Sequence, residues 1–300
     1  MSKKFLFTPI LFFFLNITAQ DNMFVVYSLK GNVSVIENNS ESKARIGTIL
    51  NGKETIKVTA GSFVTLICNE TKAFSLKKAG NYPLTSLKDS CKISSSSMSA
   101  NYLKYVWTEM TKSKGSPEKN RKYYMSNVGA VSRGDINNVW VDPRLDTVLY
   151  VSGTIPLSWK SYTDAEDFVF RLYDATGNNL ILSKETKKKH MDVADILKSL
   201  QPGKAYYWSA TIKDEPENQD KKYFHYIPKA EFSTYYNSIK KHDEAPESDA
   251  EMNFRLGFVL EEHHYIAEAF NHYLKATQLD PENGLYRFTF MSFKKDYEIK

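Results

Sequence analysis

The chain has 300 residues, of which 42% are hydrophobic and 25% charged, so it has the composition of a globular protein and is not disordered overall. Its 40 Lys and Arg residues exceed its 35 Asp and Glu residues by too little to indicate a nucleic-acid-binding protein. The two cysteines exclude a disulfide-rich scaffold and a four-cysteine zinc site, and the length indicates more than one domain. The aromatic content of 14% favours β structure.

Residues 1–20 have the pattern of a secretory signal peptide. A basic start at Lys3 and Lys4 precedes an apolar run that reaches Leu15, and the small residues Thr18 and Ala19 stand near the expected cleavage point. The run is shorter than the ~20 residues that a transmembrane helix needs. We therefore predict an exported protein with no transmembrane segment after signal removal. An uncleaved anchor and a buried N-terminal element are the alternatives.

Export places the only two cysteines, Cys68 and Cys91, in an oxidising compartment. This setting and the even count predict a disulfide between them. In the chain-entropy model, a bridge across a loop of this length stabilises the fold by ~3 kcal/mol. The alternative is a pair of unpaired small core residues. The two cysteines lack the C-x-x-C spacing of a redox motif, so the sequence does not indicate redox catalysis.

Residues 22–93 contain short strand patterns separated by turn signals such as Gly31-Asn32 and Asn51-Gly52. The candidate strands are rich in β-branched, aromatic and other apolar residues and span 24–27, 33–36, 55–58, 62–68 and 74–76. Within 62–68, the strand period of two places Phe63, Thr65 and Ile67 on one face. Short strands at this spacing predict an all-β sandwich or roll.

The turns and strands of this region follow a recognisable order. It consists of Gly31-Asn32-Val33, Gly47-x-x-Leu50-x-Gly52, Ser62-x-Val64-x-Leu66, a Phe-x-Leu strand at Phe74, and Gly80-Asn81-Tyr82. In this order the region resembles the FecR-like domain of bacterial envelope proteins. Members of that family act in signalling at the inner membrane or in exported multidomain proteins. The resemblance implies a bacterial envelope protein that is periplasmic or associated with the outer envelope.

Residues 94–142 are predicted to form a helix and a linker. After a serine run, Met98, Tyr102, Val106 and Met110 recur every four residues, which is the spacing of an amphipathic helix. We expect this apolar stripe to pack against a domain. The polar, basic stretch that follows is expected to be a linker with a solvated surface and not a nucleic-acid site.

Residues 143–236 hold seven strand candidates, which together suggest an immunoglobulin-like sandwich: 147–151, 154–159, 167–173, 179–183, 204–212, 223–226 and 229–235. Its expected core residues are Trp159, Tyr206 and Trp208. The pattern Leu200-x-Pro202-Gly203-x-x-Tyr206 resembles the turn and tyrosine corner of fibronectin type III domains. In such a corner, the Tyr206 hydroxyl bonds to the backbone of the turn while its ring enters the core.

Residues 248–300 have the helical spacing of a tetratricopeptide repeat. The matching positions lie between 250 and 283 and are Leu256, Gly257, Ala269, Tyr273, Ala276 and Pro281. Gly257 and Ala269 would let two helices approach closely, and Pro281 would end the second of them. A further helix is predicted from Leu285 to about Tyr297.

A single repeat cannot form the usual concave peptide groove, because about three repeats are needed for a stable stack. The hairpin must therefore dock on a neighbour. Three neighbours are open at this point: the chain's own β domain, a second copy of the chain, or another protein.

No motif in the sequence selects a reaction, a cofactor or a metal. The chain has no G-x-S-x-G, phosphate-loop or dinucleotide-binding pattern. His264, Glu268 and His272 are four residues apart and could share one helix face, so a zinc site is an alternative. Because there is no H-E-x-x-H spacing and no fourth ligand, we interpret the histidines as surface residues. Saccharide stacking is an alternative role for the tyrosines at 162, 207, 223, 226, 235 and 236, although strand aromatics more often belong to the core.

The sequence thus predicts a mainly β fold with a C-terminal α-helical hairpin: a FecR-like β domain, a fibronectin type III-like sandwich and one tetratricopeptide repeat. We expect a non-catalytic, exported envelope interaction or scaffold protein. Its partner would be another envelope protein or a second copy of itself, with no nucleic acid involved. The alternatives are a saccharide-binding envelope module and a FecR-type signalling component.

Overall fold

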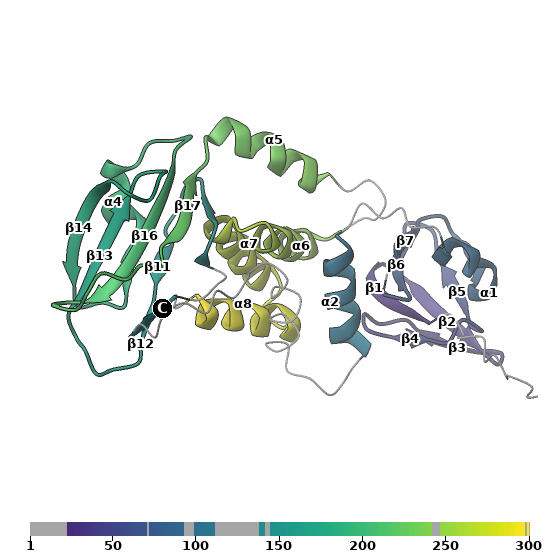
Figure 1. Ribbon diagram of the computed structural model, residues 1–300. Coiled ribbons are helices and arrows are strands. Elements are labelled where there is room, and N and C mark those ends of the chain that lie inside the picture. Colours follow the sequence, from purple (N-terminus) through teal and green to yellow (C-terminus); the bar gives the residue numbers. More distant parts are fainter. Residues whose placement is uncertain are drawn as a thin grey trace, which may run out of the picture.

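The computed structural model describes residues 23–70, 72–92, 99–111, 138–141, 145–241, 247–297 and 299. Two β domains stand at opposite ends of the molecule, and the C-terminal helices lie between them (Figure 1). The predicted mainly β fold with C-terminal helices is therefore confirmed. The predicted signal peptide falls outside the described residues. In the part of the chain that the structure describes, no helix has the length and apolar character needed to span a membrane.

The N-terminal β domain consists of two antiparallel four-stranded sheets, with strand orders β4-β1-β6-β7 and β3-β2-β5-β8. The strands are β1 (Phe24–Lys30), β2 (Val33–Glu37), β3 (Ser40–Lys43), β4 (Ile49–Leu50), β5 (Thr55–Val58), β6 (Phe63–Cys68), β7 (Lys72–Leu76) and β8 (Gly80–Pro83). All five strands predicted here are confirmed. The sequence did not predict β3, because its Ser-Glu-Ser-Lys residues are all exposed and show no apolar alternation.

Strand β6 is buried on both faces. Val64 and Leu66 pack into the core between the two sheets. On the opposite face, Ile67 and Val25 belong to a second apolar core, which includes helix α2 (Ala100–Thr111). The predicted amphipathic helix is thus confirmed, and it covers the outer face of the sheet that contains β1 and β6.

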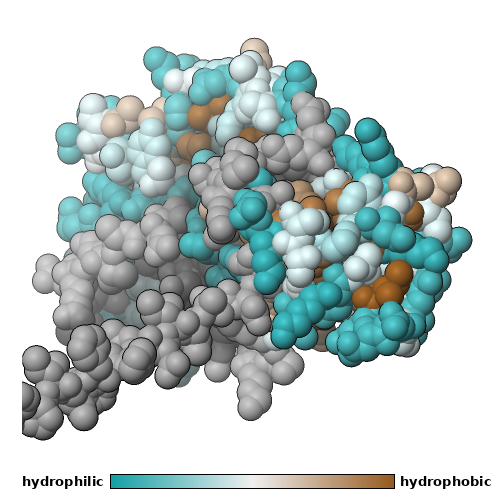
Figure 2. All heavy atoms as spheres, turned by 90° about the vertical axis from the view of Figure 1, so that its right-hand side faces the viewer, coloured by the Kyte–Doolittle hydropathy of each residue, from teal (hydrophilic) through white to brown (hydrophobic). Residues whose placement is uncertain are grey.

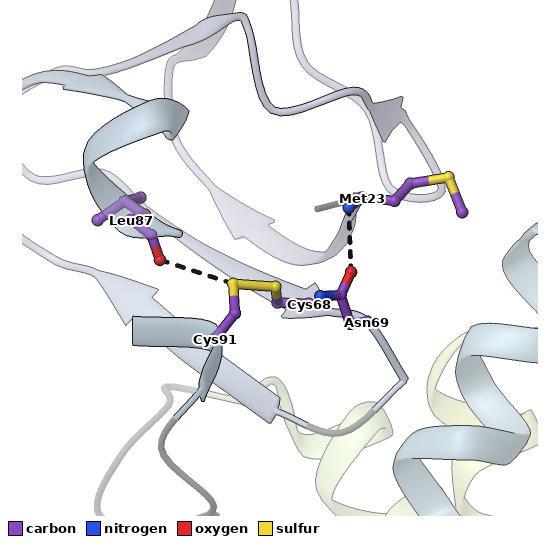
Figure 3. The surroundings of a disulfide bond; sticks show 5 residues. All are labelled: Met23, Cys68, Asn69, Leu87 and Cys91. Carbon is purple, nitrogen blue, oxygen red and sulfur yellow. Dashed lines mark hydrogen bonds between the residues drawn. A yellow bond between two sulfur atoms is a disulfide. The ribbon is translucent and has the colours of Figure 1, made fainter. Parts of the chain in front are cut away.

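The disulfide between Cys68 and Cys91 is present. It joins the last residue of β6 to the 3-10 turn Asp89–Lys92, which follows the short helix α1 (Leu84–Leu87). Figure 3 shows the bridge next to Asn69, whose side-chain oxygen accepts a hydrogen bond of 3.0 Å from the backbone N–H of Met23. Met23, at the start of the domain, and Cys91, near its end, are therefore both linked to residues at the end of β6.

The second β domain contains a five-stranded sheet with the order β10-β17-β16-β13-β14, and two further pairs, β11-β15 and β12-β9. Strand β10 is parallel to β17, and the other pairs are antiparallel. The strands are β9 (Val139–Trp140), β10 (Val148–Tyr150), β11 (Pro156–Ser158), β12 (Lys160–Ser161), β13 (Phe168–Tyr173), β14 (Leu180–Thr186), β15 (His190–Asp192), β16 (Ala205–Ile212) and β17 (Lys222–Tyr226). Strand β9 lies within the segment that was expected to be helix and linker.

The residues predicted for the core of this domain are buried. Trp159, Tyr206 and Trp208 are each no more than 5% exposed. Phe170 lies between the two tryptophans and stacks on both, with ring centroids 6.5 Å from Trp159 and 5.8 Å from Trp208. The Tyr206 hydroxyl accepts a 2.7 Å hydrogen bond from the backbone N–H of Gln201, which confirms the predicted bond to the turn.

The seventh predicted strand of this region is wrong. Residues 229–235 lie in helix α5 (Lys229–Lys240), which begins directly after Pro228. Proline is favoured at the beginning of a helix because it has no N–H to satisfy and its φ is already suitable. The apolar side chains of Phe232, Tyr235, Tyr236 and Ile239 recur at intervals of three and four, which is a helical period and not the period of two expected of a strand.

Three helices follow: α6 (Asp249–Glu262), α7 (Ile266–Leu279) and α8 (Gly284–Asp296). Helix α6 begins with a capping box in which Ser248 accepts from the Glu251 backbone N–H and the Glu251 side chain accepts from the Ser248 backbone N–H. Helix α7 ends two residues before Pro281. The predicted hairpin and third helix are thus present.

Candidate functional site

The two helices of the hairpin pack closely at the positions expected from the sequence. The contact region of α6 and α7 contains five of the predicted residues: Leu256, Gly257, Ala269, Tyr273 and Ala276. Apart from the glycine, each of them is at most 1% exposed. These residues are core residues and are not available to a partner. The surface that could bind a partner must lie elsewhere.

The hairpin docks on helix α2. The ring of Tyr105 stacks on Phe258 of α6 at 5.2 Å, and its hydroxyl shares a 2.6 Å hydrogen bond with the Thr289 hydroxyl of α8. Tyr102, one turn earlier in α2, contacts Phe258 at 5.6 Å. Helix α2 thus lies between the C-terminal helices and the sheet of the N-terminal domain.

The N-terminal β domain also contacts the hairpin directly. Ser28 of β1 donates a 3.0 Å hydrogen bond to the Glu251 carboxylate at the start of α6. Beside it, the Tyr27 hydroxyl lies 2.8 Å from the Tyr102 hydroxyl, and both rings are buried. These buried polar contacts fix the orientation of the domain relative to the helices.

The second β domain holds the opposite side of the hairpin. The backbone N–H of Leu149 in β10 donates to the His264 carbonyl at 3.0 Å, and the N–H of Ser152 donates to the Glu268 carboxylate at 3.1 Å. Ser158 donates to the Tyr297 carbonyl at 3.2 Å. Of the three neighbours left open by the sequence, the chain's own β domains are therefore the ones on which the hairpin docks.

Helix α5 connects the second β domain to the hairpin through aromatic contacts. Phe232 and Tyr235 pack on Tyr265 with ring centroids 5.1 and 5.3 Å apart. Tyr236 stacks on His272 at 5.6 Å. Burial lowers the pKa of the His272 imidazole to about 4, so this ring is neutral at physiological pH. The tyrosines at 235 and 236, considered above for saccharide stacking, are thus occupied by internal contacts.

The residues once considered for zinc do not converge. His272 Nδ1 lies 2.8 Å from the Asn253 side-chain oxygen, whereas Glu268 faces the loop of the second β domain. Within the described ranges, no group of three or more His, Cys, Asp or Glu side chains is placed to hold a metal ion.

A cavity of about 890 Å³ lies where the N-terminal β domain, α2 and the C-terminal helices meet; we call it the interdomain cavity. Its wall comes from β1, the loop before β4, the end of α2, and the N-terminal ends of α6 and α8. Among its lining residues are Leu29, Phe63, Val106, Met110, Phe254, Leu285 and Tyr286, which make much of its surface apolar.

The charged side chains of the interdomain cavity are mostly acidic. Lys30 is the single basic residue among the described lining residues, and the acidic ones are Glu109, Glu247, Glu251 and Asp280. Glu247 accepts a buried 2.8 Å ion-pair contact from Arg255, so its charge is largely compensated. Burial raises the pKa of Glu251, although the capping bonds from Ser248 and the bond from Ser28 act in the opposite direction. Asp280 is a further acidic residue of this wall.

Two large apolar side chains at the cavity are exposed to solvent. Ile46, in the loop before β4, is 53% exposed, and Phe288 of α8 is 51% exposed. By contrast, the end face of the molecule in Figure 2 is mostly hydrophilic, and its hydrophobic residues form small separate patches. Exposed apolar side chains from two separate parts of the chain thus lie on one concave surface, which is a property of binding sites.

Sequence reasoning missed this site. Its residues come from segments that begin near positions 27, 46, 102, 247 and 280, and no local pattern connects them. The only local signal is Phe288, an aromatic residue on the exposed side of an amphipathic helix. No protein-family model matches the chain, and no curated protein matches it.

Proposed function

We propose that the protein is a non-catalytic, exported interaction protein of the bacterial cell envelope that binds a basic segment of a protein partner in the interdomain cavity. The observation that carries this proposal is the position of Ile46 and Phe288, which are both exposed and both line an apolar cavity with acidic side chains. Apolar surface supplies affinity, and the acidic residues favour a partner segment that contains Lys or Arg.

The same proposal assigns three modules to the chain. The antiparallel strands β17, β16, β13 and β14, the separate β11-β15 pair and the Tyr206 corner support a fibronectin type III-like sandwich. The contact between Gly257 and Tyr273 supports a tetratricopeptide-like hairpin. The turn glycines of the N-terminal domain support a FecR-like domain. In this arrangement the hairpin joins the β domains and forms one wall of the cavity.

The test selects a displayed peptide library on the mature chain and then measures the binding of the enriched peptides. We expect the enriched peptides to combine positive charge with apolar residues. Replacing Phe288 or Ile46 with Asp should weaken their binding by about tenfold or more, because each change places a charge on an apolar contact surface. Both residues are exposed, so the substitutions are compatible with folding.

The matched control is Met291→Asp. Met291 lies on the same helix as Phe288, is 64% exposed, and does not line the interdomain cavity. We expect binding by this variant to equal that of the wild type. Enrichment of acidic peptides, or equal losses in the Phe288 and Met291 variants, would overturn the proposal. If the wild type dimerises and Phe288→Asp abolishes the dimer, the cavity binds a second copy of the chain, and the proposal of a partner peptide is overturned.

A further inference from the structure

A second cleft, of about 570 Å³, lies on the second β domain and has a different chemistry. Its lining residues belong to β12 and the residue before it, to the start of β15 and to the loop between β14 and β15. They are Trp159, Lys160, Ser161, Lys187, Lys188, Lys189 and His190. None of the described lining residues is acidic. We call this surface the lysine cleft.

The backbone holds the lysines of this cleft in place. The N–H of Trp159 donates to the Lys189 carbonyl at 3.0 Å, which extends the ladder of β11 and β15 by one residue. The N–H of Lys188 donates to the Thr186 hydroxyl at 3.0 Å. The loop that carries the three consecutive lysines is therefore fixed next to Lys160.

Lys187, Lys188 and Lys189 differ from other lysines of the same domain. Lys213 pairs with Glu185 at 2.8 Å, and Lys222 pairs with Asp220 at 2.9 Å. Among the described residues, no carboxylate lies within ion-pair distance of Lys187, Lys188 or Lys189. All three lysines are exposed, so their charges are available to an anion in solution.

Aromatic side chains lie directly beside the lysine cleft. Lys160 in β12 is paired with Trp140 in β9, and its ammonium group lies 5.6 Å from the centroid of the Trp140 ring. Tyr162, two residues after Lys160, is 71% exposed, and its N–H donates to the Asn138 carbonyl at 3.0 Å, which continues the same ladder. Side chains two residues apart on a strand share a face, so Tyr162, Lys160 and Trp140 form one exposed surface.

We propose that this surface binds an anionic polysaccharide. The cleft is larger than a single oxyanion needs, and it contains several lysine side chains. These two properties suit a polymer that carries repeated carboxylate or sulfate groups. The flat, partly exposed rings of Trp140 and Tyr162 provide an apolar surface on which the faces of sugar rings pack. This site shares no lining residue with the interdomain cavity, so the two proposals are tested independently.

The test measures binding of alginate oligomers, which are polyuronates, to the mature chain at several salt concentrations. We expect binding to weaken as the salt concentration rises, because several lysines that bind the polysaccharide release the counterions of its acidic groups. Replacing Lys187, Lys188 and Lys189 together with Ala should weaken binding by about tenfold or more and reduce the salt dependence. The matched control replaces three exposed lysines of the same region, at positions 198, 204 and 229, with Ala. This control removes the same charge and should change binding by less than about twofold.

A second variant, Tyr162→Ala, separates a saccharide from other polyanions. It should weaken binding of alginate but leave binding of inorganic polyphosphate unchanged, since only the sugar uses the ring. Equal losses in the two lysine triple variants would overturn the proposal, because they would show a response to net charge alone. Stronger binding of single-stranded DNA than of alginate, or equal binding of neutral dextran, would overturn it as well.

Discussion

Gly257 of α6 lies directly against the ring of Tyr273 in α7, with no space for a methyl group between them. A Cβ atom at position 257 would lie 2.8 Å from Cδ1 of that ring. The ring has little freedom to move, because Tyr273 is 1% exposed and its hydroxyl donates a 2.9 Å hydrogen bond to Glu261. The close approach of the two helices therefore depends on the glycine.

We expect Gly257→Ala to destabilise the protein. Overpacking a close contact costs about 1–3 kcal/mol, and the gain of roughly 1 kcal/mol in helix propensity offsets only part of it. Urea unfolding of the variant and the wild type measures the difference. The control is Gly284→Ala in α8, where an added Cβ would meet its nearest atom at an ordinary 3.6 Å. Equal stability of both variants and the wild type would contradict the packing argument.

The disulfide should contribute measurably to the stability of the N-terminal β domain. The sequence separation of Cys68 and Cys91 is 23 residues, and closing a loop of that size in the unfolded chain is worth about 3 kcal/mol. We expect the double variant Cys68→Ala, Cys91→Ala to lose about this much unfolding free energy in urea. Wild-type protein reduced with dithiothreitol should unfold at a similar urea concentration. A double variant as stable as the oxidised wild type would refute this expectation.

The tyrosine corner provides a test of the second β domain. Replacing Tyr206 with Phe keeps the buried ring but leaves the N–H of Gln201 without its 2.7 Å acceptor. We expect a loss of about 1–2 kcal/mol, the usual cost of removing one partner of a partly buried hydrogen bond. Thermal unfolding of Tyr206→Phe, with Tyr207→Phe on the neighbouring position as the control, measures it. A larger loss for the control than for Tyr206→Phe would show that the corner is not what stabilises this turn.

The parts of the fold that were predictable are those in which a local pattern determines the structure. Strand alternation located β1, β2, β5 and β6, and the spacing of Gly257, Ala269 and Tyr273 located the hairpin. Helix α5 was missed because its aromatic residues have high strand propensity and follow β17 closely, while its helical period was overlooked. Here packing on Tyr265 and the proline at position 228 outweigh β propensity.

The candidate sites were less predictable than the fold. The interdomain cavity joins Ile46 and Phe288, which are far apart in the sequence, and it exists only because α2 and the hairpin dock as they do. The lysine cleft contains a visible run, Lys187 to Lys189, but its neighbour Lys160 and the ring of Trp140 reach it through strand pairing. Tertiary contacts of this kind leave no signal in a local window of sequence.

The contact between α7 and the second β domain should depend on pH through Glu268. Burial raises the pKa of this carboxyl from 4.5 to about 7, although backbone N–H groups of the 151–152 loop act in the opposite direction. Because the folded-state pKa is the higher one, the group contributes stability below about pH 4.5, and this contribution is lost as the pH rises to about 7. The full difference is on the order of 3 kcal/mol, at about 1.4 kcal/mol per pH unit.

We therefore expect the unfolding free energy of the wild type to fall between pH 4.5 and 7 relative to that of Glu268→Gln. The glutamine keeps the side-chain oxygen that accepts from Ser152 and does not titrate, so its own profile should lack this decrease. Urea unfolding across the pH range measures both profiles, with the exposed Glu185→Gln as a control that follows the wild type. Parallel profiles for the wild type and Glu268→Gln would show that the carboxyl titrates normally and that the contact between α7 and the second β domain is insensitive to pH.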